Sequence, residues 1–493
     1  MKVLDKENFA IYILIGISCF SKILGFLRDA VLASIYGTSH MADVFFFSLS
    51  IPDFFFDMIN NTIIIGFIPI TTSLLLKKSE YDVNLFVSGT IKFVFLISLV
   101  FFILVLLFGD SFVSLFAPGF IGESYDLAVI FVKILVFSLI FKCFISVFSG
   151  YLNVKRVFYP PALTGIILDI CIIISIFLSI RFSYYLLPAF VVVASFLQFL
   201  LLLFYIKKQK IKFYISAPMF TKEHINMMKN VLPALISVSV LQISTLINRA
   251  LASNIMEGGI AYLNYSSKMS FFAENIVVAS LCTVLYPTLS TSFAKNDLYK
   301  YCEDLSKGIK KTIFFLIPVS VGLFLLSNPI IEILFKRGSF TDKDVLMTSL
   351  MMQLNIIGVL GIGLQTVFTR ALFALKKINV VVINSLLMLF FSAVLSILLS
   401  KMFGLLGIAL ATGIVYTLGG LWYFISIYSI VKKIDVKDIF KYLVKIITVS
   451  SVMGIIIYFV RSLDFDVYAS FVLSCIIGSS IYFLLVKAFK LTH

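Results

Sequence analysis

Runs of about twenty apolar residues recur along almost the whole sequence, and the short loops between them hold most of the charged residues. A helix of that length crosses a hydrocarbon core of about 30 Å, so each run is long enough to span a membrane. Of the 493 residues, 61% are hydrophobic and 13% are charged, against about a quarter charged in a typical soluble protein. The sequence therefore predicts an all-α polytopic membrane protein with about fourteen transmembrane helices, at residues 8–36, 41–76, 86–117, 126–152, 160–181, 184–206, 225–254, 258–294, 308–328, 345–374, 378–400, 404–431, 438–460 and 466–487.

The net charge of +15 indicates membrane topology and no nucleic-acid partner, because the lysines and arginines lie in short loops and form no basic domain. About 23 of them lie on one side of the expected spans and about six on the other. An excess of basic residues marks the cytoplasmic side, and the number of spans is even, so both termini are expected in the cytoplasm. The start of the chain lacks a small-residue cleavage site and is expected to be the first span.

Cysteine and histidine residues give no sign of a metal, redox or cofactor site. The six cysteines form no C-x-x-C pair, and the three histidines lie at loops or ends without a ligand cluster. The sequence also contains no P-loop, no G-x-S-x-G elbow and no Gly-rich dinucleotide fingerprint. We therefore expect no cofactor, and a transporter that is neither an enzyme nor an ATP-driven pump.

The basic segment 207–224 divides the chain into two similar halves. Leu-Ala-Ser at 32–34 precedes a proline at position 69, and Leu-Ala-Ser at 251–253 precedes a proline at position 287. Six spans in each half fit a parallel repeat around a cavity, as in alternating-access transporters, although apolar helices can also resemble one another by chance. A final hairpin either forms a lipid-facing groove or only supports the scaffold. The expected parts are an N-terminal six-helix half, a cytoplasmic basic linker, a C-terminal six-helix half and a two-helix hairpin, at 1–206, 207–224, 225–431 and 432–493.

Charged side chains inside the expected spans are the candidates for function, because an ionisable group at bilayer depth is costly unless it faces protein or water. Lys22 and Asp29 lie two helical turns apart on one face, and Asp53 and Asp57 share another face. Asp169 also lies within a span.

A single cavity between the halves is expected to receive four cations that could bind an anionic head group such as a pyrophosphate, namely Lys22, Arg28, Arg249 and Lys268. The alternative is that the buried charges only pair between helices or snorkel to water. This alternative applies most to Asp43 and Arg370, which lie near the ends of their expected spans.

Several short segments occur in an order that resembles one known family. They are 21–30 (SKILGFLRDA), 42–46 (ADVFF), 117–120 (APGF), 283–290 (TVLYPTLS), 334–341 (LFKRGSFT) and 370–375 (RALFAL). They resemble the MurJ (MviN) lipid II flippases, which belong to the multidrug/oligosaccharidyl-lipid/polysaccharide exporter superfamily, and the resemblance extends over about residues 10–430.

The resemblance implies export of the undecaprenyl-pyrophosphate-linked peptidoglycan precursor from the inner to the outer leaflet of the bacterial cytoplasmic membrane. It implies alternating access without ATP hydrolysis, with lipid II and membrane lipids as partners and cell-wall synthesis proteins as candidate further partners. The residues that it assigns to substrate binding are Arg28, Lys22 and Lys268. The residues expected in gating or ion pairs are Asp29, Asp43, Arg249, Asp57 and Arg370.

The sequence departs from the family at several positions. Phe56 and Asp57 stand where the family has a basic pair, and Asn61 and Phe271 replace acidic residues. The sodium site of some relatives has no carboxylate here, since the matching positions are Asn248, Ser392, Ser396 and Thr412. These departures leave three alternatives open: a flippase for another polyprenyl-linked saccharide, a multidrug antiporter on the same scaffold, or a non-transporting partner of cell-wall enzymes.

Overall fold

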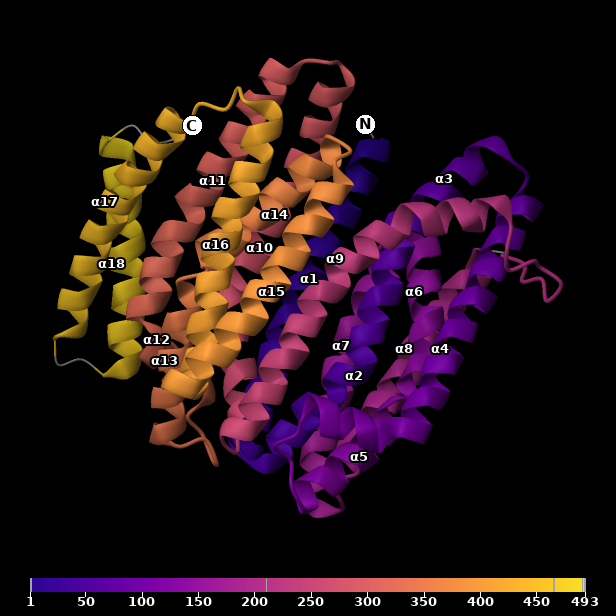
Figure 1. Cartoon of the computed structure of the whole chain (residues 1–493), viewed down its shortest axis with the longest axis horizontal. Coiled ribbons are helices and arrows are strands. Elements are labelled where there is room, and N and C mark those ends of the chain that lie inside the picture. The colour runs from indigo at the N-terminus through magenta and orange to yellow at the C-terminus, as the bar shows by residue number, and fades with distance from the viewer. Residues whose placement is uncertain (1, 210, 464–465, 490, 492–493) are drawn as a thin grey trace. The chain divides into compact units, whose positions relative to one another are not determined.

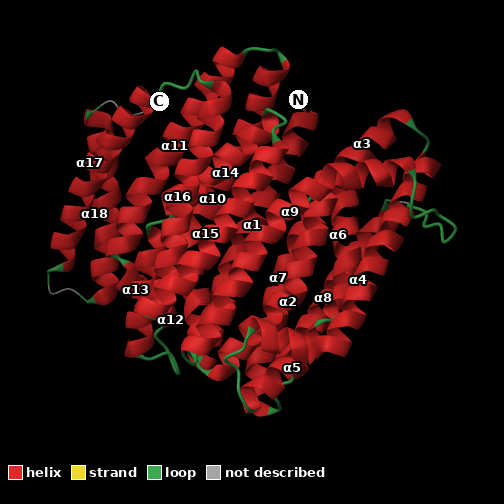
Figure 2. Ribbon diagram, in the orientation of Figure 1, coloured by secondary structure: helices red, strands yellow, loops and turns green. Residues whose placement is uncertain are grey.

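The computed structural model describes residues 2–209, 211–463, 466–489 and 491, with the backbone alone for residues 2–15, 230, 233–234 and 238. Every regular element within these ranges is a helix (Figure 2). The prediction of an all-α polytopic membrane protein is confirmed. The helices group into two compact units, Met1–Ile260 and Ala261–His493.

The first unit is built around α2, which packs on α5, α6 and α9, while α1 packs on α7 and α8 packs on both α6 and α7. Its elements include one π-helical segment, η1, which continues α2 into α3. The bounds are α1 Lys2–Tyr36, α2 His40–Thr62, η1 Ile63–Phe67, α3 Ile68–Lys77, α4 Glu80–Phe116, α5 Glu123–Leu135, α6 Ser138–Val154, α7 Tyr159–Arg181, α8 Leu186–Lys208 and α9 Lys222–Ile255.

The second unit is built around α11, α14 and α16. Helix α16 packs on α13, α14 and α15, and α11 packs on α14 and α17. Helices α17 and α18 lie side by side at the C-terminal end (Figure 1), and the Tyr482 hydroxyl of α18 donates to the Phe314 carbonyl of α11 at 2.7 Å. The bounds are α10 Gly259–Ala294, α11 Leu298–Leu325, α12 Ser327–Phe335, α13 Asp342–Ile356, α14 Val359–Ala374, α15 Ile378–Phe403, α16 Leu405–Val431, α17 Val436–Arg461 and α18 Val467–Ala488.

Within the described residues, eleven helical segments are long and apolar enough to cross a membrane, and two bent helix pairs raise the number to thirteen if each pair is one span. Helix α1 covers the remaining expected span. The expected continuous helices 126–152 and 345–374 are each broken, with α5 and α6 bent by 42° and α13 and α14 by 45°. Sequence hydropathy missed both breaks because the apolar character continues through them.

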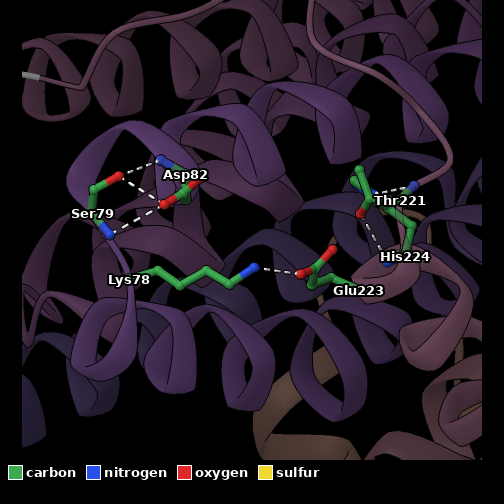
Figure 3. Close-up of polar contacts among 6 residues, drawn as sticks. All are labelled: Lys78, Ser79, Asp82, Thr221, Glu223 and His224. Atoms are coloured by element: carbon green, nitrogen blue, oxygen red, sulfur yellow. Dashed lines mark hydrogen bonds and ion pairs between the residues drawn. The ribbon is translucent and has the colours of Figure 1, made fainter.

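The connection between α8 and α9 is held against the start of α4 by a polar group that we call the α4–α9 clamp (Figure 3), made of Lys78, Ser79, Asp82, Thr221, Glu223 and His224. Ser79 with Asp82, and Thr221 with His224, form capping boxes at the first turns of α4 and α9. Lys78 Nζ donates to Glu223 Oε1 at 2.8 Å, and this hydrogen bond lowers the pKa of Glu223 to about 2. The clamp ties the start of α9 to α4.

Candidate functional site

Ionisable side chains from α1, α2, α6, α7 and α9 form a network in the first unit that we call the ionic cluster. Most of its members lie well inside their helices, and an ionisable group at such a position in a membrane-spanning helix is a candidate for function. Carboxylates outnumber cations in it, and hydrogen bonds or electrostatic interactions connect its members to one another. The ionic cluster consists of Arg28, Asp29, Asp53, Asp57, Lys142, Asp169 and Arg249.

Arg28 is held between two carboxylates. Its Nε and Nη2 donate to Asp29 Oδ1 at 3.1 and 3.0 Å, and its Nη1 donates to Asp169 Oδ1 at 2.8 Å. Both carboxylates are buried, whereas the Arg28 side chain as a whole is 21% exposed. Helix α1 lies close to α7, since a Cβ on Gly165 would lie 2.6 Å from Ser21 Oγ. The three hydrogen bonds give the planar guanidinium a fixed orientation.

Lys142 is the deeply placed cation of α6. Its Nζ lies 2.6 Å from Asp53 Oδ1 and 5.3 Å from the centre of the Phe56 ring, a cation–π distance. The lysine side chain is 8% exposed and the aspartate side chain is 52% exposed. Lys142 was not among the site residues expected from the sequence, although a lysine in the middle of an apolar run is itself a signal of function.

Helix α2 is joined to α9 by two further polar contacts. Gln242 Nε2 donates to Asp57 Oδ2 at 2.6 Å, and Arg249 Nη1 donates to the Phe46 carbonyl at 3.2 Å. Asp53 also acts electrostatically on Arg28 and Arg249. Asp53 therefore lies among three cations that come from three different helices.

The start of α2 is fixed to the loop between α9 and α10. The buried Asp43 accepts a hydrogen bond through Oδ2 from the Gly258 N–H at 2.7 Å. Gly258 has a φ of +80°, and a Cβ there would lie 2.1 Å from the Thr38 carbonyl oxygen, so only glycine fits. The His40 N–H donates to Glu257 Oε1 of the same loop at 2.9 Å. Asp43 is thus a structural link within the first unit.

The structure brings together only part of the predicted site. Lys22 is exposed on α1, with no hydrogen bond or ion pair to another described residue. In the second unit, Lys268 is half-buried on α10 and Arg370 is exposed on α14. The buried Glu274 of α10 accepts a hydrogen bond from Thr366 Oγ1 at 3.1 Å.

The residues that depart from the family pattern make defined contacts in the structure. Phe56 lies beside Lys142, and Asn61 Nδ2 donates back to the Asp57 carbonyl at 2.8 Å. Phe271 packs edge-on against Tyr416, with the ring centres 5.3 Å apart. An aromatic contact thus occupies the place of one expected acidic side chain.

The described residues contain no group of three or more His, Cys, Asp or Glu side chains that could hold a metal ion. The sodium-site positions lie on different helices: Asn248 on α9, Ser392 and Ser396 on α15, and Thr412 on α16. Thr412 Oγ1 donates to the Ile408 carbonyl at 2.9 Å, within its own helix. The sequence disfavours sodium coupling at these positions because none of them is a carboxylate, and this stays a prediction.

Sequence comparison gives one family over most of the chain. The family model described as "Lipid II flippase MurJ" matches residues 32–477. A "Probable lipid II flippase MurJ" of Buchnera aphidicola subsp. Schizaphis graminum is 28% identical over 455 residues, 90% of this chain and 88% of the relative. A "Lipid II flippase MurJ" of Thermosipho africanus is 29% identical over 471 residues, 95% of this chain and 94% of the relative.

Comparison of folds agrees with the sequence. A structure titled "Lipid II flippase MurJ, inward closed conformation" superposes with a TM-score of 0.83 at 27% identity, covering 97% of this chain and 98% of that one. An inward-facing multidrug resistance MATE transporter of the MOP superfamily superposes with a TM-score of 0.71 at 13% identity, covering 86% and 99%. The second likeness concerns the fold alone.

Proposed function

The chain belongs to the lipid II flippase MurJ family, and we propose that it moves lipid II from the inner to the outer leaflet of the bacterial cytoplasmic membrane. The observation that carries the proposal is the family match over residues 32–477, supported by the TM-score of 0.83 to a lipid II flippase structure. Transport proceeds by alternating access and includes no catalytic step on the substrate. The likeness to a multidrug transporter, at 13% identity, gives no reason to prefer drug export.

In this proposal the diphosphate of lipid II is bound by Arg28 and Lys22 of the first unit and by Lys268 of the second. Arginine suits this task because its planar fork of donors matches phosphate oxygens. The fixed orientation of the Arg28 guanidinium and the partial exposure of the side chain as a whole support the assignment. Because Arg28 already bonds to Asp29 and Asp169, the phosphate must share it with these carboxylates or displace one of them.

The gating role is proposed for residues whose polar contacts would change as the transporter alternates between its two states. Asp43 supports this role through its bond to Gly258, and Asp57 through its bond to Gln242, since both bonds join α2 to segments far away in the sequence. Such bonds act as two-state contacts if they form in only one conformation. The proposed set is Asp29, Asp43, Arg249, Asp57 and Arg370.

The proposed orientation has both termini in the cytoplasm, because the basic loops then lie on the cytoplasmic side. We also propose the four parts expected from the sequence: two six-helix halves, a basic linker at 207–224 and a C-terminal hairpin. Lipid II and membrane lipids are the proposed partners, and cell-wall synthesis proteins are candidates that would receive the exported precursor.

Rescue of a strain depleted of its own lipid II flippase tests the function. The wild-type chain should restore growth, and Arg28→Gln should not, with a loss of translocation of about tenfold or more, because a hydrogen bond to a charged group is lost. Arg28→Lys, which keeps the charge, should retain part of the activity. Protein abundance in the membrane is measured alongside, since Asp29 loses a partner in Arg28→Gln.

Two results would contradict the assignments in different ways. Full rescue by Arg28→Gln would exclude Arg28 from substrate binding. Failure of the wild-type chain to rescue, at normal abundance and without lipid II translocation in vesicles, would favour a flippase for another polyprenyl-linked saccharide.

A further inference from the structure

We propose that Lys142 is a binding residue for the diphosphate of the transported lipid, and that Asp53 occupies its place until the substrate displaces it. This inference rests on the proposed function and adds to it a cation on α6 and an internal competitor on α2. The pair is Lys142 Nζ to Asp53 Oδ1 at 2.6 Å, between residues 89 positions apart in the sequence.

The two partners of this ion pair differ in how freely they can move. Lys142 is 8% exposed and lies beside the Phe56 ring, so its ammonium cannot leave without giving up both contacts for an apolar surrounding. Asp53 is 52% exposed, so fewer protein contacts hold its carboxylate and it has room to turn away from Lys142. The cation is therefore fixed and the anion is exchangeable.

The surroundings of Asp53 favour an anion with more charge. Arg28 and Arg249 both interact electrostatically with this carboxylate, in addition to the direct contact from Lys142. A diphosphate carries more negative charge than one carboxylate and offers more acceptor oxygens, so the three cations attract it more strongly.

The acidic neighbours set a limit to that attraction. Asp57 lies close enough to Asp53 and Lys142 to act on both, and Asp29 and Asp169 compete for Arg28. The carboxylates therefore keep the binding reversible, as a carrier requires, because they can take the cations back when the head group leaves.

Two substitutions with opposite expected effects separate this proposal from a purely structural pair. Full-length protein in lipid nanodiscs is titrated with fluorescent lipid II, and translocation is measured in vesicles. Lys142→Gln should weaken binding by about tenfold or more, and Lys142→Arg should stay within a few-fold of the wild type. Asp53→Asn should bind lipid II more tightly by several-fold and release it more slowly, because the internal competitor has lost its charge.

Lys133→Gln is the matched control. Lys133 lies on α5, in the same bent pair of helices as Lys142, and its Nζ bonds to the exposed Asp110 at 3.1 Å, outside the ionic cluster. It should bind and transport lipid II like the wild type. Thermal unfolding of each variant shows whether a change in binding reflects loss of fold.

The outcomes are distinct. Wild-type affinity in a folded Lys142→Gln variant overturns the inference, and so does unchanged or weaker binding by Asp53→Asn. If the Lys142→Gln variant does not accumulate in the membrane, the lipid II affinity of the Asp53→Asn variant alone tests the inference. A wild-type chain that neither binds nor translocates lipid II contradicts the proposed function itself, whereas a functional wild type with an indifferent Lys142→Gln contradicts this inference alone.

Discussion

At the start of α9, the imidazole of His224 is 3% exposed and lies 3.2 Å from Thr90 Oγ1 through its Nε2. Burial is the main cause that lowers its pKa below the usual 6.5, whereas a backbone hydrogen bond of Phe86 and the charge of Glu223 act in the opposite direction. Below pH 6.5 the unfolded chain therefore binds a proton that the folded chain does not, so folding is destabilised as the pH falls. We expect the thermal midpoint of the wild-type protein to fall between pH 7 and pH 5.

Replacement of the imidazole isolates this effect. His224→Gln keeps a hydrogen-bonding side chain without a proton that titrates, so its midpoint should depend less on pH than that of the wild type over the same range. Thr72→Val, at an exposed position on α3 of the same unit, is the control, and it should keep the wild-type slope because it removes no titratable group. Equal pH dependence in the wild type and His224→Gln would contradict the prediction.

Candidate site residues could be predicted from the sequence where a charged residue interrupts an apolar run. The residues to which they bond could not be predicted in this way. Arg28, Asp29 and Asp43 stand out in the sequence for this reason. The bond from Arg28 to Asp169 joins residues 141 positions apart, and its formation depends on how α1 and α7 are rotated against each other. Lys142 also interrupts an apolar run, but its contacts with Asp53 and Phe56 become visible only in the structure.

Helices α14 and α16 approach each other through glycines. A Cβ on Gly361 would lie 2.1 Å from the Tyr416 carbonyl oxygen, and one on Gly420 would lie 2.9 Å from the Gly361 Cα. Small residues permit close helix contacts of this kind in membranes. Gly361→Ala should therefore destabilise the protein by about 1–3 kcal/mol, because the backbones must move apart, and the loss is measured by thermal or denaturant-induced unfolding.

Gly322 of α11 provides the control for that substitution. A Cβ at this position meets nothing within 4 Å, so Gly322→Ala should be neutral or stabilise the helix by about 0.5–1 kcal/mol. If both alanine variants unfold at the wild-type midpoint, the close approach of α14 and α16 is not a source of stability.

Sequence hydropathy predicted where the long helices lie, but it did not predict the bends between helices or the short helix α12. An apolar run shows that a segment is long enough to span a membrane, but it gives no information on a change of direction within it. The 42° bend between α5 and α6 falls at Val136–Phe137, without a proline or glycine there. The nine-residue helix α12 is too short to be recognised as a span, and it was not expected.

On the scale of the whole chain, helix packing defines the two units, and the basic segment 207–224 does not coincide with the boundary between them. Helix α9 packs on α2, η1 and α4 of the first unit, although the basic segment 207–224 precedes it in the sequence. At the start of α9, the ion pair between Lys78 and Glu223 and the contact of His224 Nε2 with Thr90 Oγ1 connect this helix to α4 and to the turn before it. A change in composition shows where a connection lies and not which unit the next helix joins.

The two ends of α8 offer a direct test of the proposed orientation. Tyr184 precedes the helix and Lys212 follows it, and both side chains are exposed, so a helix that crosses the membrane places them on opposite sides. Because basic loops stay in the cytoplasm, Tyr184→Cys should react with a membrane-impermeant maleimide in intact spheroplasts, and Lys212→Cys only after permeabilisation. The exposed Cys19 and Cys475 are first replaced by serine to remove background. The reverse labelling pattern would invert the proposed topology, and labelling of both positions from outside would show that α8 does not cross the membrane.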